Sequence, residues 1–216
     1  MNQESLAREQ IVAVGESLYN RGLSPGSSGN ISIRLSDGWL MTPTNTALGQ
    51  LDSAGLSRLD SEGRLVDGDP PTKEALLHLM FYRHRRQAQA IVHLHATHAA
   101  AVSCLAGLDV EDCLPPLTAY HVLKVGRLPL IPYHPPGDES LAAAIGAHAE
   151  TAHALLLANH GPLVCGPSLD AAVATIEELE ETAKLYLLLR GSSPSPLSPP
   201  EVDRLLGSSR ERKSVV

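Results

Sequence analysis

The sequence predicts an α/β protein in which helices cover the faces of a mixed or antiparallel sheet. Segments with the apolar spacing of helices alternate with short apolar segments that are typical of strands. Several neighbouring strands are joined by turns, such as Asp37-Gly38, that are too short for a parallel crossover. The length of 216 residues fits one compact domain.

The expected elements follow from these spacings and from capping and turn residues. Thr72 and Ser168 are suitable N-caps for two helices, Gly191 ends a helix, and Glu62-Gly63 forms a turn. The elements are a helix over 4–21, a strand over 31–35 with its partner over 37–44, small strands within 56–60 and 63–68, a helix over 72–85, a strand over 90–97, a helix over 97–107, a strand-rich block over 115–133, a helix over 141–151, strands over 154–161 and 161–166, and a helix over 168–190.

The C-terminal segment has a different composition. GSSPSPLSPP, over 191–200, is a Pro/Ser linker, and PEVDRLLG, over 200–207, predicts a short helix with Ser198 as its cap. We therefore expect a folded domain over 1–190, followed by a linker and a C-terminal tail over 191–216.

Composition argues against several classes of protein. The net charge is −7 and no basic stripe is visible, which argues against a nucleic-acid surface. No apolar run reaches the roughly 20 residues of a membrane helix. Three cysteines without CxxC spacing, behind the polar start MNQESLAREQ, predict a cytoplasmic protein. Cys104 and Cys165 lie among apolar residues and are expected in the core.

Three histidines in the stretch IVHLHATHAA, over 91–100, raise the possibility of a metal site. Residues two apart in a strand point to the same face, so His93 and His95 can chelate one divalent ion. His98 falls where a helix should begin, and its direction does not follow from the sequence. An HxH pair alone is a weak motif and fits packed, hydrogen-bonded histidines better than metal ligands.

A further histidine strengthens the metal interpretation. His160, in LLLANHG, ends an apolar strand and precedes a turn, where functional groups are often held on a rigid frame. Three neutral imidazoles with an open position are typical of a catalytic metal site rather than a structural one. Among the remaining histidines, His121 and His134 are the two that can approach such a site.

An acidic residue can complete this site. Glu74, in PTKEALLH, falls in the first turn of an expected helix, where a carboxylate is favoured by the helix dipole alone. Beside a metal the same carboxylate can serve as a fourth ligand and as a base.

Three turns are rich in residues that accommodate anions. GSSGNIS places Ser28, Gly29 and Asn30 in a small-residue turn, TPTN ends at Asn45, and Thr72-Lys73 lies at a helix start. Each of these stretches is also compatible with an ordinary loop. Together with a metal they suggest a small phosphorylated substrate.

The motifs GSSGNIS, TPT, PTKE, HLHATH and LLLANHG, in this order, resemble the class II aldolase/epimerase family over residues 5–190. The resemblance implies a three-layer α/β/α sandwich around a mostly antiparallel central sheet. It also implies a homotetramer with active sites near the subunit interfaces, and one Zn²⁺ per subunit. Three imidazoles accept other divalent ions as well.

The resemblance also assigns roles to residues. It implies that His93, His95 and His160 bind the metal and that Glu74 is the acid/base that also touches it. Tyr120 matches a tyrosine that members contribute across the interface as a proton donor, although a buried strand tyrosine is an equal alternative. The implied substrate and phosphate contacts are Ser28, Gly29, Asn30, Thr44, Asn45, Thr72 and Lys73.

The reaction within the family depends on the rest of the pocket. The fuculose-phosphate aldolase branch has two serines before the glutamate, whereas this chain has Thr72 and Lys73. A fixed positive charge there favours a substrate with both a phosphate and a carboxylate. PTKE, PPLTAY and LEETAKLYLLLRG most resemble the 3-oxo-tetronate 4-phosphate decarboxylase branch, which implies loss of CO2 through a metal-bound enediolate to give dihydroxyacetone phosphate.

Other functions remain open at this point. Sugar-phosphate aldolases and ribulose-phosphate 4-epimerases belong to the same family and use a similar site. Adducin-like head domains share the family without its chemistry, but the complete set of candidate ligands argues against such an interaction module. Three histidines without cysteine argue against a structural zinc site.

Overall fold

The computed structural model describes residues 2–135 and 138–213, and it contains one eight-stranded sheet. The strand order is β4-β3-β2-β1-β5-β8-β7-β6, and the pairing is antiparallel except between β6 and β7. The strands are β1 (Asn30–Leu35), β2 (Gly38–Met41), β3 (Ser57–Asp60), β4 (Leu65–Asp67), β5 (Ala90–His93), β6 (Leu130–Ile131), β7 (Ala154–Leu157) and β8 (Gly161–Gly166).

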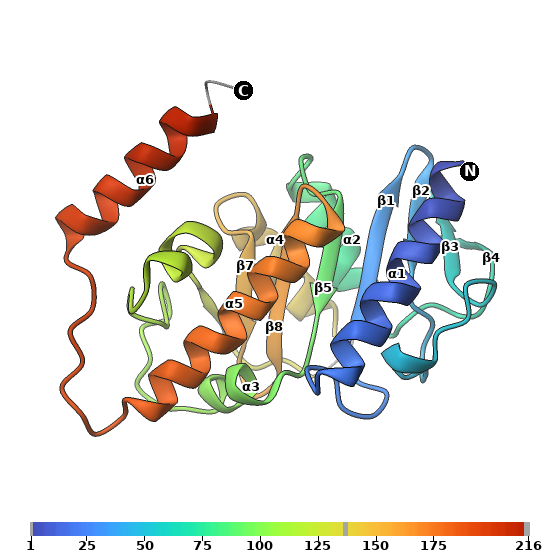
Figure 1. The fold of residues 1–216 in the computed structure, drawn as a ribbon. Coiled ribbons are helices and arrows are strands. Elements are labelled where there is room, and N and C mark those ends of the chain that lie inside the picture. The colour runs from blue at the N-terminus through green and yellow to red at the C-terminus, as the bar shows by residue number, and fades with distance from the viewer. Residues whose placement is uncertain (1, 136–137, 214–216) are drawn as a thin grey trace.

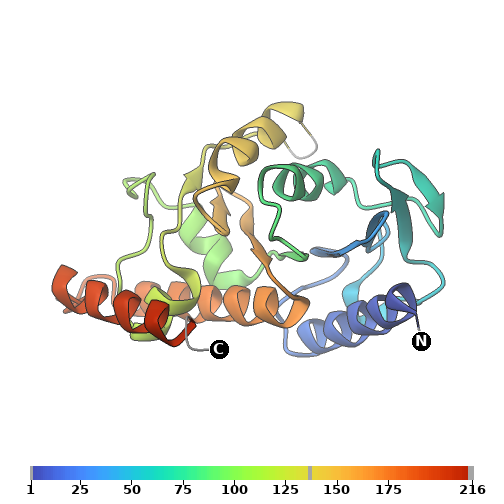
Figure 2. The same cartoon turned by 90° about the horizontal axis from the view of Figure 1, so that it is seen from above.

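Helices cover both faces of this sheet (Figures 1 and 2). On one face lie α1 (Gln3–Asn20) and α5 (Leu169–Leu188), and on the other lie α2 (Ala75–His84) and α4 (Glu139–Ala149). Each face has its own buried apolar cluster, because side chains alternate between the two faces along each strand. The predicted three-layer α/β/α sandwich around a mostly antiparallel sheet is therefore confirmed.

Three of the remaining helices are short and pack against α1 or α5, and the fourth is C-terminal. They are η1 (Leu48–Gln50), α3 (Thr97–Ser103), η2 (His121–Val125) and α6 (Pro199–Lys213). In Figure 1 the C-terminal helix α6, drawn in red, extends beside the body of the protein. It is longer than the predicted segment over 200–207, and residues 214–216 of the predicted tail lie outside the described residues. Within the described ranges, no helix has the length and apolar character that crossing a membrane requires.

Two predicted elements are wrong in part. The block over 115–133 contains only the two-residue strand β6, and Thr118 instead accepts hydrogen bonds from His121 and Val122 at the start of η2. Prolines at 115, 116, 129 and 132 disfavour strand pairing because they cannot donate to a ladder. Helix α2 begins at Ala75, not near Thr72, because Thr72 already accepts the Glu74 and Ala75 amides in a turn.

One core prediction is also wrong. Cys165 is buried as expected, but Cys104 is exposed because α3 ends at Ser103 and leaves Cys104 at its C-cap. Val102, two residues earlier, is the apolar neighbour that faces the core.

The strand register brings the candidate site residues to one end of the sheet. His93, the last residue of β5, pairs with Asn30 of β1 and with Leu163 of β8. His160 lies in the turn immediately before β8 begins. The ends of three neighbouring strands therefore meet where the sequence placed its candidate ligands.

Candidate metal centre

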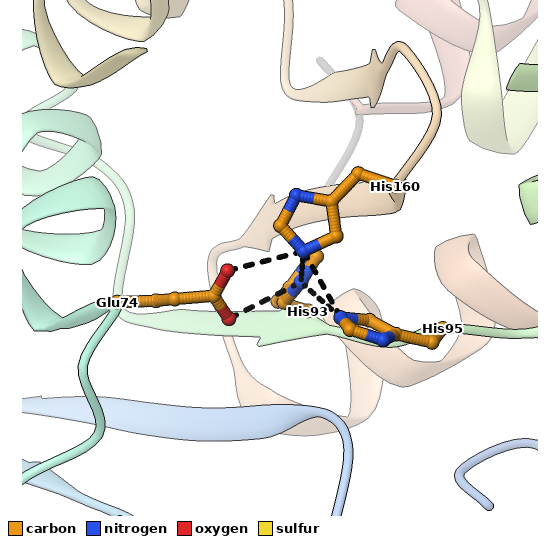
Figure 3. A group of neighbouring side chains, drawn as sticks. All are labelled: Glu74, His93, His95 and His160. Carbon is orange, nitrogen blue, oxygen red and sulfur yellow. Dashed lines mark hydrogen bonds and ion pairs between the residues drawn. The ribbon is translucent and has the colours of Figure 1, made fainter. Parts of the chain in front are cut away.

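Four side chains point toward one another at this end of the sheet (Figure 3). Glu74 precedes α2, His93 ends β5, His95 lies two residues beyond that strand, and His160 comes from the β7–β8 turn. One possible ligand atom from each residue lies within 4.8 Å of the others, and among the described residues they form the only such group.

The spacing of the four groups fits a bound divalent cation. The three Nε2 atoms lie 3.0–3.3 Å apart, and the Glu74 carboxylate oxygens lie 3.3 Å from Nε2 of His93 and 3.1 Å from Nε2 of His160. A tetrahedral ion with metal–nitrogen distances of about 2.0–2.1 Å places its ligands about 3.3–3.4 Å apart. Nitrogen and carboxylate donors are also the ligand types of catalytic metal sites.

Hydrogen bonding and burial keep the histidines in the form that binds metals. His93 donates from Nδ1 to the carbonyl of Pro162 at 2.8 Å, which leaves Nε2 as the lone-pair atom. Burial lowers the pKa of His93 to about 4, although nearby Glu74 opposes this shift. Burial and the neighbouring His160 also lower the pKa of His95. Neutral imidazoles are therefore expected for His93 and His95 at neutral pH, and Nε2 of His93 offers its lone pair to the group.

The carboxylate of Glu74 is held as an anion. Burial alone would raise the pKa of Glu74, but the facing His93 and hydrogen bonds from His160 and Asn30 lower it well below its ordinary value. Nδ2 of Asn30 donates to Oε2 of Glu74 at 2.7 Å. The site thus combines imidazole nitrogens with one carboxylate anion.

Two glycines allow the backbone to approach closely around the ligands. Gly29 has φ of 80°, and a Cβ there would lie 3.1 Å from the carbonyl oxygen of His93. A Cβ on Gly161 would lie only 2.4 Å from the carbonyl oxygen of Leu94. Gly161 therefore lets the strand that follows His160 lie against the segment that carries His95.

A cavity of about 230 Å³ opens beside this group. Its lining combines candidate metal ligands with the three anion-accommodating turns. The lining residues are Ser27, Ser28, Gly29, Asn30, Pro43, Thr44, Asn45, Thr72, Lys73, Glu74, His95 and His160. Every residue that the sequence suggested as a substrate or phosphate contact therefore lines one cavity.

The turns are fixed by backbone contacts between segments distant in sequence. The amide of Thr72 donates to the carbonyl of Thr42, and the amide of Thr44 donates to that of Pro70. Asn45 adopts φ of 59°, a left-handed conformation that asparagine tolerates better than most residues. The TPTN and PTKE motifs thus form one wall of the cavity.

Other residues singled out in the sequence lie elsewhere. Tyr120 is 64% exposed and does not line the cavity. His98 pairs with Glu180 through Nδ1 at 2.7 Å, outside the ligand group. Neither His121, which is buried, nor His134, which bonds Ser140, belongs to that group.

Two buried residues that form hydrogen bonds near the candidate site, His78 and Glu180, were not identified from the sequence. His78 on α2 contacts Asn30, and Glu180 on α5 accepts hydrogen bonds from the first amides of α3. The four-residue spacing between Glu74 and His78 is the one available indication, because it places both on one side of a helix. The pairing with Asn30 depends on tertiary contacts.

A larger cavity, of about 460 Å³, lies at the opposite end of β5 and β8 and includes Arg85, Lys124 and Gly166. It contains none of the four clustered ligands. The smaller cavity is therefore the candidate substrate site, because candidate metal ligands line it and none line the larger one.

The fold and the site together define an α/β sandwich with a candidate metal centre, made of three histidines and one glutamate, beside a cavity lined by short polar residues and Lys73. The class II aldolase and adducin N-terminal domain profile matches residues 9–187, and the chain belongs to this family.

Two relatives and one solved structure are similar to this chain over most of its length. A 3-oxo-tetronate 4-phosphate decarboxylase from Cupriavidus necator is 46% identical over 190 residues, which cover 88% of each chain. An L-fuculose phosphate aldolase from Haemophilus influenzae is 32% identical over 191 residues, covering 88% of this chain and 85% of the aldolase. The crystal structure of YgbL from Escherichia coli superposes with a TM-score of 0.92 at 42% identity, covering 94% of this chain and 99% of YgbL.

Proposed function

We propose that this protein is a metal-dependent enzyme that converts 3-oxo-tetronate 4-phosphate into dihydroxyacetone phosphate and CO2. The observation that carries the proposal is the similarity to decarboxylases of that name, at 46% identity over 88% of both chains. The presence of a complete candidate ligand set argues against a non-catalytic, adducin-like interaction module.

The proposed cofactor is one Zn²⁺ per subunit, held by His93, His95, His160 and Glu74. The donor set supports a divalent ion, and its tetrahedral spacing favours zinc over ions that prefer six oxygen ligands. A bound cation supplies stabilisation for the negative charge that develops when CO2 leaves.

The reaction requires one bond to break and one proton to be placed. The bond between the carboxylate carbon and C2 breaks, its electron pair moves toward C2 and the C3 ketone, and C2 is then protonated. Glu74 is the proposed group that holds or moves a proton next to these atoms, with one oxygen fixed by Asn30. Burial to 12% exposure keeps bulk water from competing for it.

The anion-accommodating turns are the proposed phosphate site. Ser28, Gly29, Thr44, Asn45 and Thr72 offer short hydroxyls, amides and close backbone to one cavity. Asn30 lines the same cavity, but its side chain also contacts Glu74 and His78.

Lys73 is the proposed contact for the substrate carboxylate or phosphate. Its exposed side chain lines the cavity beside Glu74 and brings a positive charge there. A positive charge there favours a substrate that carries a carboxylate in addition to its phosphate.

Tyr120 is the proposed proton donor from a neighbouring subunit. Its exposure and its position outside the cavity of its own chain support a contribution to the site of a neighbouring subunit. We accordingly propose a homotetramer with active sites near the interfaces. The three free cysteines support a cytoplasmic location, where thiols stay reduced.

The second candidate function is a sugar-phosphate aldolase, because the L-fuculose phosphate aldolase relative is 32% identical over most of both chains. The Thr72-Lys73 pair before Glu74 favours the decarboxylase.

The deciding experiment offers the purified, zinc-loaded protein two kinds of substrate. With 3-oxo-tetronate 4-phosphate we expect CO2 and dihydroxyacetone phosphate in equal amounts, and with fuculose 1-phosphate we expect no aldehyde. Lys73→Met should lower kcat/KM for the acid substrate by at least tenfold. Aldehyde release without CO2 would establish the aldolase instead. An unchanged kcat/KM in Lys73→Met would contradict the proposed contact between Lys73 and the substrate.

A further inference from the structure

A chain of hydrogen bonds runs from the candidate metal centre into the layer between the sheet and α2. Nδ2 of Asn30 donates to Oε2 of Glu74 at 2.7 Å, and Oδ1 of Asn30 lies 2.6 Å from Nε2 of His78. Nδ1 of His78 lies 2.7 Å from Oγ of Ser32, which lies 2.9 Å from the hydroxyl of Tyr82. Four side chains thus connect one carboxylate oxygen to the core.

The chain behind Glu74 is shielded from water. His78 and Ser32 are 0% exposed, Tyr82 is 1% exposed and Asn30 is 4% exposed. Buried polar groups that lack a partner are destabilising, so each member must donate or accept where its neighbour permits. Burial also lowers the pKa of His78 to about 3, which leaves one ring nitrogen to donate and the other to accept.

Only one direction of donation satisfies every member. If His78 donates from Nε2 to Asn30, then Ser32 donates to Nδ1 and Tyr82 donates to Ser32, and the Asn30 NH2 group faces Glu74. The reverse direction makes Nε2 an acceptor for the Asn30 NH2 group. It would turn the Asn30 carbonyl oxygen toward the anionic carboxylate, which is repulsive. The anion at Glu74 therefore selects the first direction.

We propose that His78 is a positioning residue for Glu74. By donating to Oδ1, it fixes the rotation of the Asn30 amide so that the NH2 group faces Oε2 of Glu74. The backbone of Asn30 is already fixed opposite His93 by strand pairing, so the orientation of the amide is the variable that remains. This inference rests on the proposed role of Glu74 as a metal ligand, and it assigns a function to a histidine outside the ligand group.

The inference predicts that metal binding depends on His78 although His78 does not touch the metal. Removing a direct hydrogen-bond partner of a metal ligand typically changes affinity by about 10–100-fold. His78 acts on Glu74 through such a partner, Asn30. His78→Leu removes the donor, and the Asn30 amide can then turn its oxygen toward Glu74. His78→Gln keeps an amide N–H near the position of Nε2, so it should restore the contact.

The test is a Co²⁺ titration of the metal-free protein, followed by visible absorption. We expect His78→Leu to bind Co²⁺ at least tenfold more weakly than the wild type, with altered absorption bands, and His78→Gln to bind within a few-fold of it. Ser57→Ala is the matched control, because Ser57 is also 0% exposed and donates one hydrogen bond, to the carbonyl of Asp69 at 2.7 Å. It should lower the melting temperature without changing the Co²⁺ spectrum.

Equal Co²⁺ affinity and spectra in His78→Leu and the wild type would overturn the inference, as would absence of Co²⁺ binding by the wild type. If His78→Leu does not fold, the histidine tautomer decides. Nitrogen-15 NMR of the wild type should show the His78 proton on Nε2, and a proton on Nδ1 alone would refute the proposed direction. Co²⁺ binding is measured without substrate, so an inactive wild type that binds Co²⁺ would contradict the proposed decarboxylation and leave this inference intact.

Discussion

Replacing Gly161 with alanine should separate two metal ligands without removing either. The added Cβ would lie 2.4 Å from the carbonyl oxygen of Leu94 and 3.4 Å from Cα of His95. An ordinary carbon–oxygen contact is about 3.3 Å, so the two segments must move apart by roughly 0.9 Å. His160 immediately precedes Gly161, and its Nε2 now lies 3.0 Å from Nε2 of His95.

The displacement should affect both stability and function. Overpacking of this kind typically destabilises a fold by about 1–3 kcal/mol. A misplacement near 1 Å in a catalytic constellation can lower the rate about 100-fold. We therefore expect Gly161→Ala to bind zinc at least tenfold more weakly and to lose most of its kcat/KM.

Zinc affinity is measured by competition with a chromophoric chelator, and kcat/KM by CO2 release. Gly207→Ala is the control, because a Cβ there meets nothing within 4 Å in the exposed helix α6. It should leave zinc affinity unchanged. Wild-type affinity and turnover in Gly161→Ala would refute the view that this close approach sets the ligand spacing.

Four further outcomes are expected. Chelation should lower the melting temperature, and re-addition of Zn²⁺ should restore it, because an ion that binds only the folded state stabilises it; an unchanged melting temperature would contradict the metal site. Only Cys104 should react with a thiol reagent at pH 8 in the folded protein, because Cys104 is exposed. Burial raises the pKa of the Cys113 and Cys165 thiols to about 12. Three reactive thiols without denaturant would contradict this prediction. Burial lowers the pKa of His121 to about 4, so the folded protein binds this proton more weakly than the unfolded chain does. The free energy of unfolding should therefore keep its full value above about pH 6.5 and fall by about 3 kcal/mol as the pH drops toward 4. Urea unfolding of His121→Asn should show a weaker dependence on pH over that window. A chain ending at Arg190 should retain zinc affinity if 1–190 folds as a domain, and calorimetric zinc titration checks this.

Much of the fold could be predicted from the sequence because its cues are local. Alternating apolar residues and turn residues determined most strands, and Ser168 does cap α5 through the amide of Ala171. The prediction of a strand-rich block over 115–133 was wrong because a strand and a single helical turn contain similar apolar runs over that length. The hydroxyl of Thr118 accepts from the amide of His121 at the start of η2 and donates to Glu178 of α5, and the second of these contacts is tertiary.

The residues of the candidate site could be predicted from the sequence, but the hydrogen bonds that connect them could not. His93 and His95 are two apart, and His160 comes before a turn, so their residue types were visible in the sequence. Their closeness follows from strand register, since β5 pairs with β8. The link from Asn30 to His78 joins a strand to a helix 48 positions away, and no local pattern encodes it.

The most direct test of the account follows CO2 release from 3-oxo-tetronate 4-phosphate in one preparation before chelation, after chelation and after reloading with Zn²⁺. The account predicts that CO2 release is lost on chelation and returns with Zn²⁺, and that Glu74→Gln stays inactive throughout. CO2 release that persists in the chelated protein, or in reloaded Glu74→Gln at the wild-type rate, would contradict a metal-dependent decarboxylation at this site.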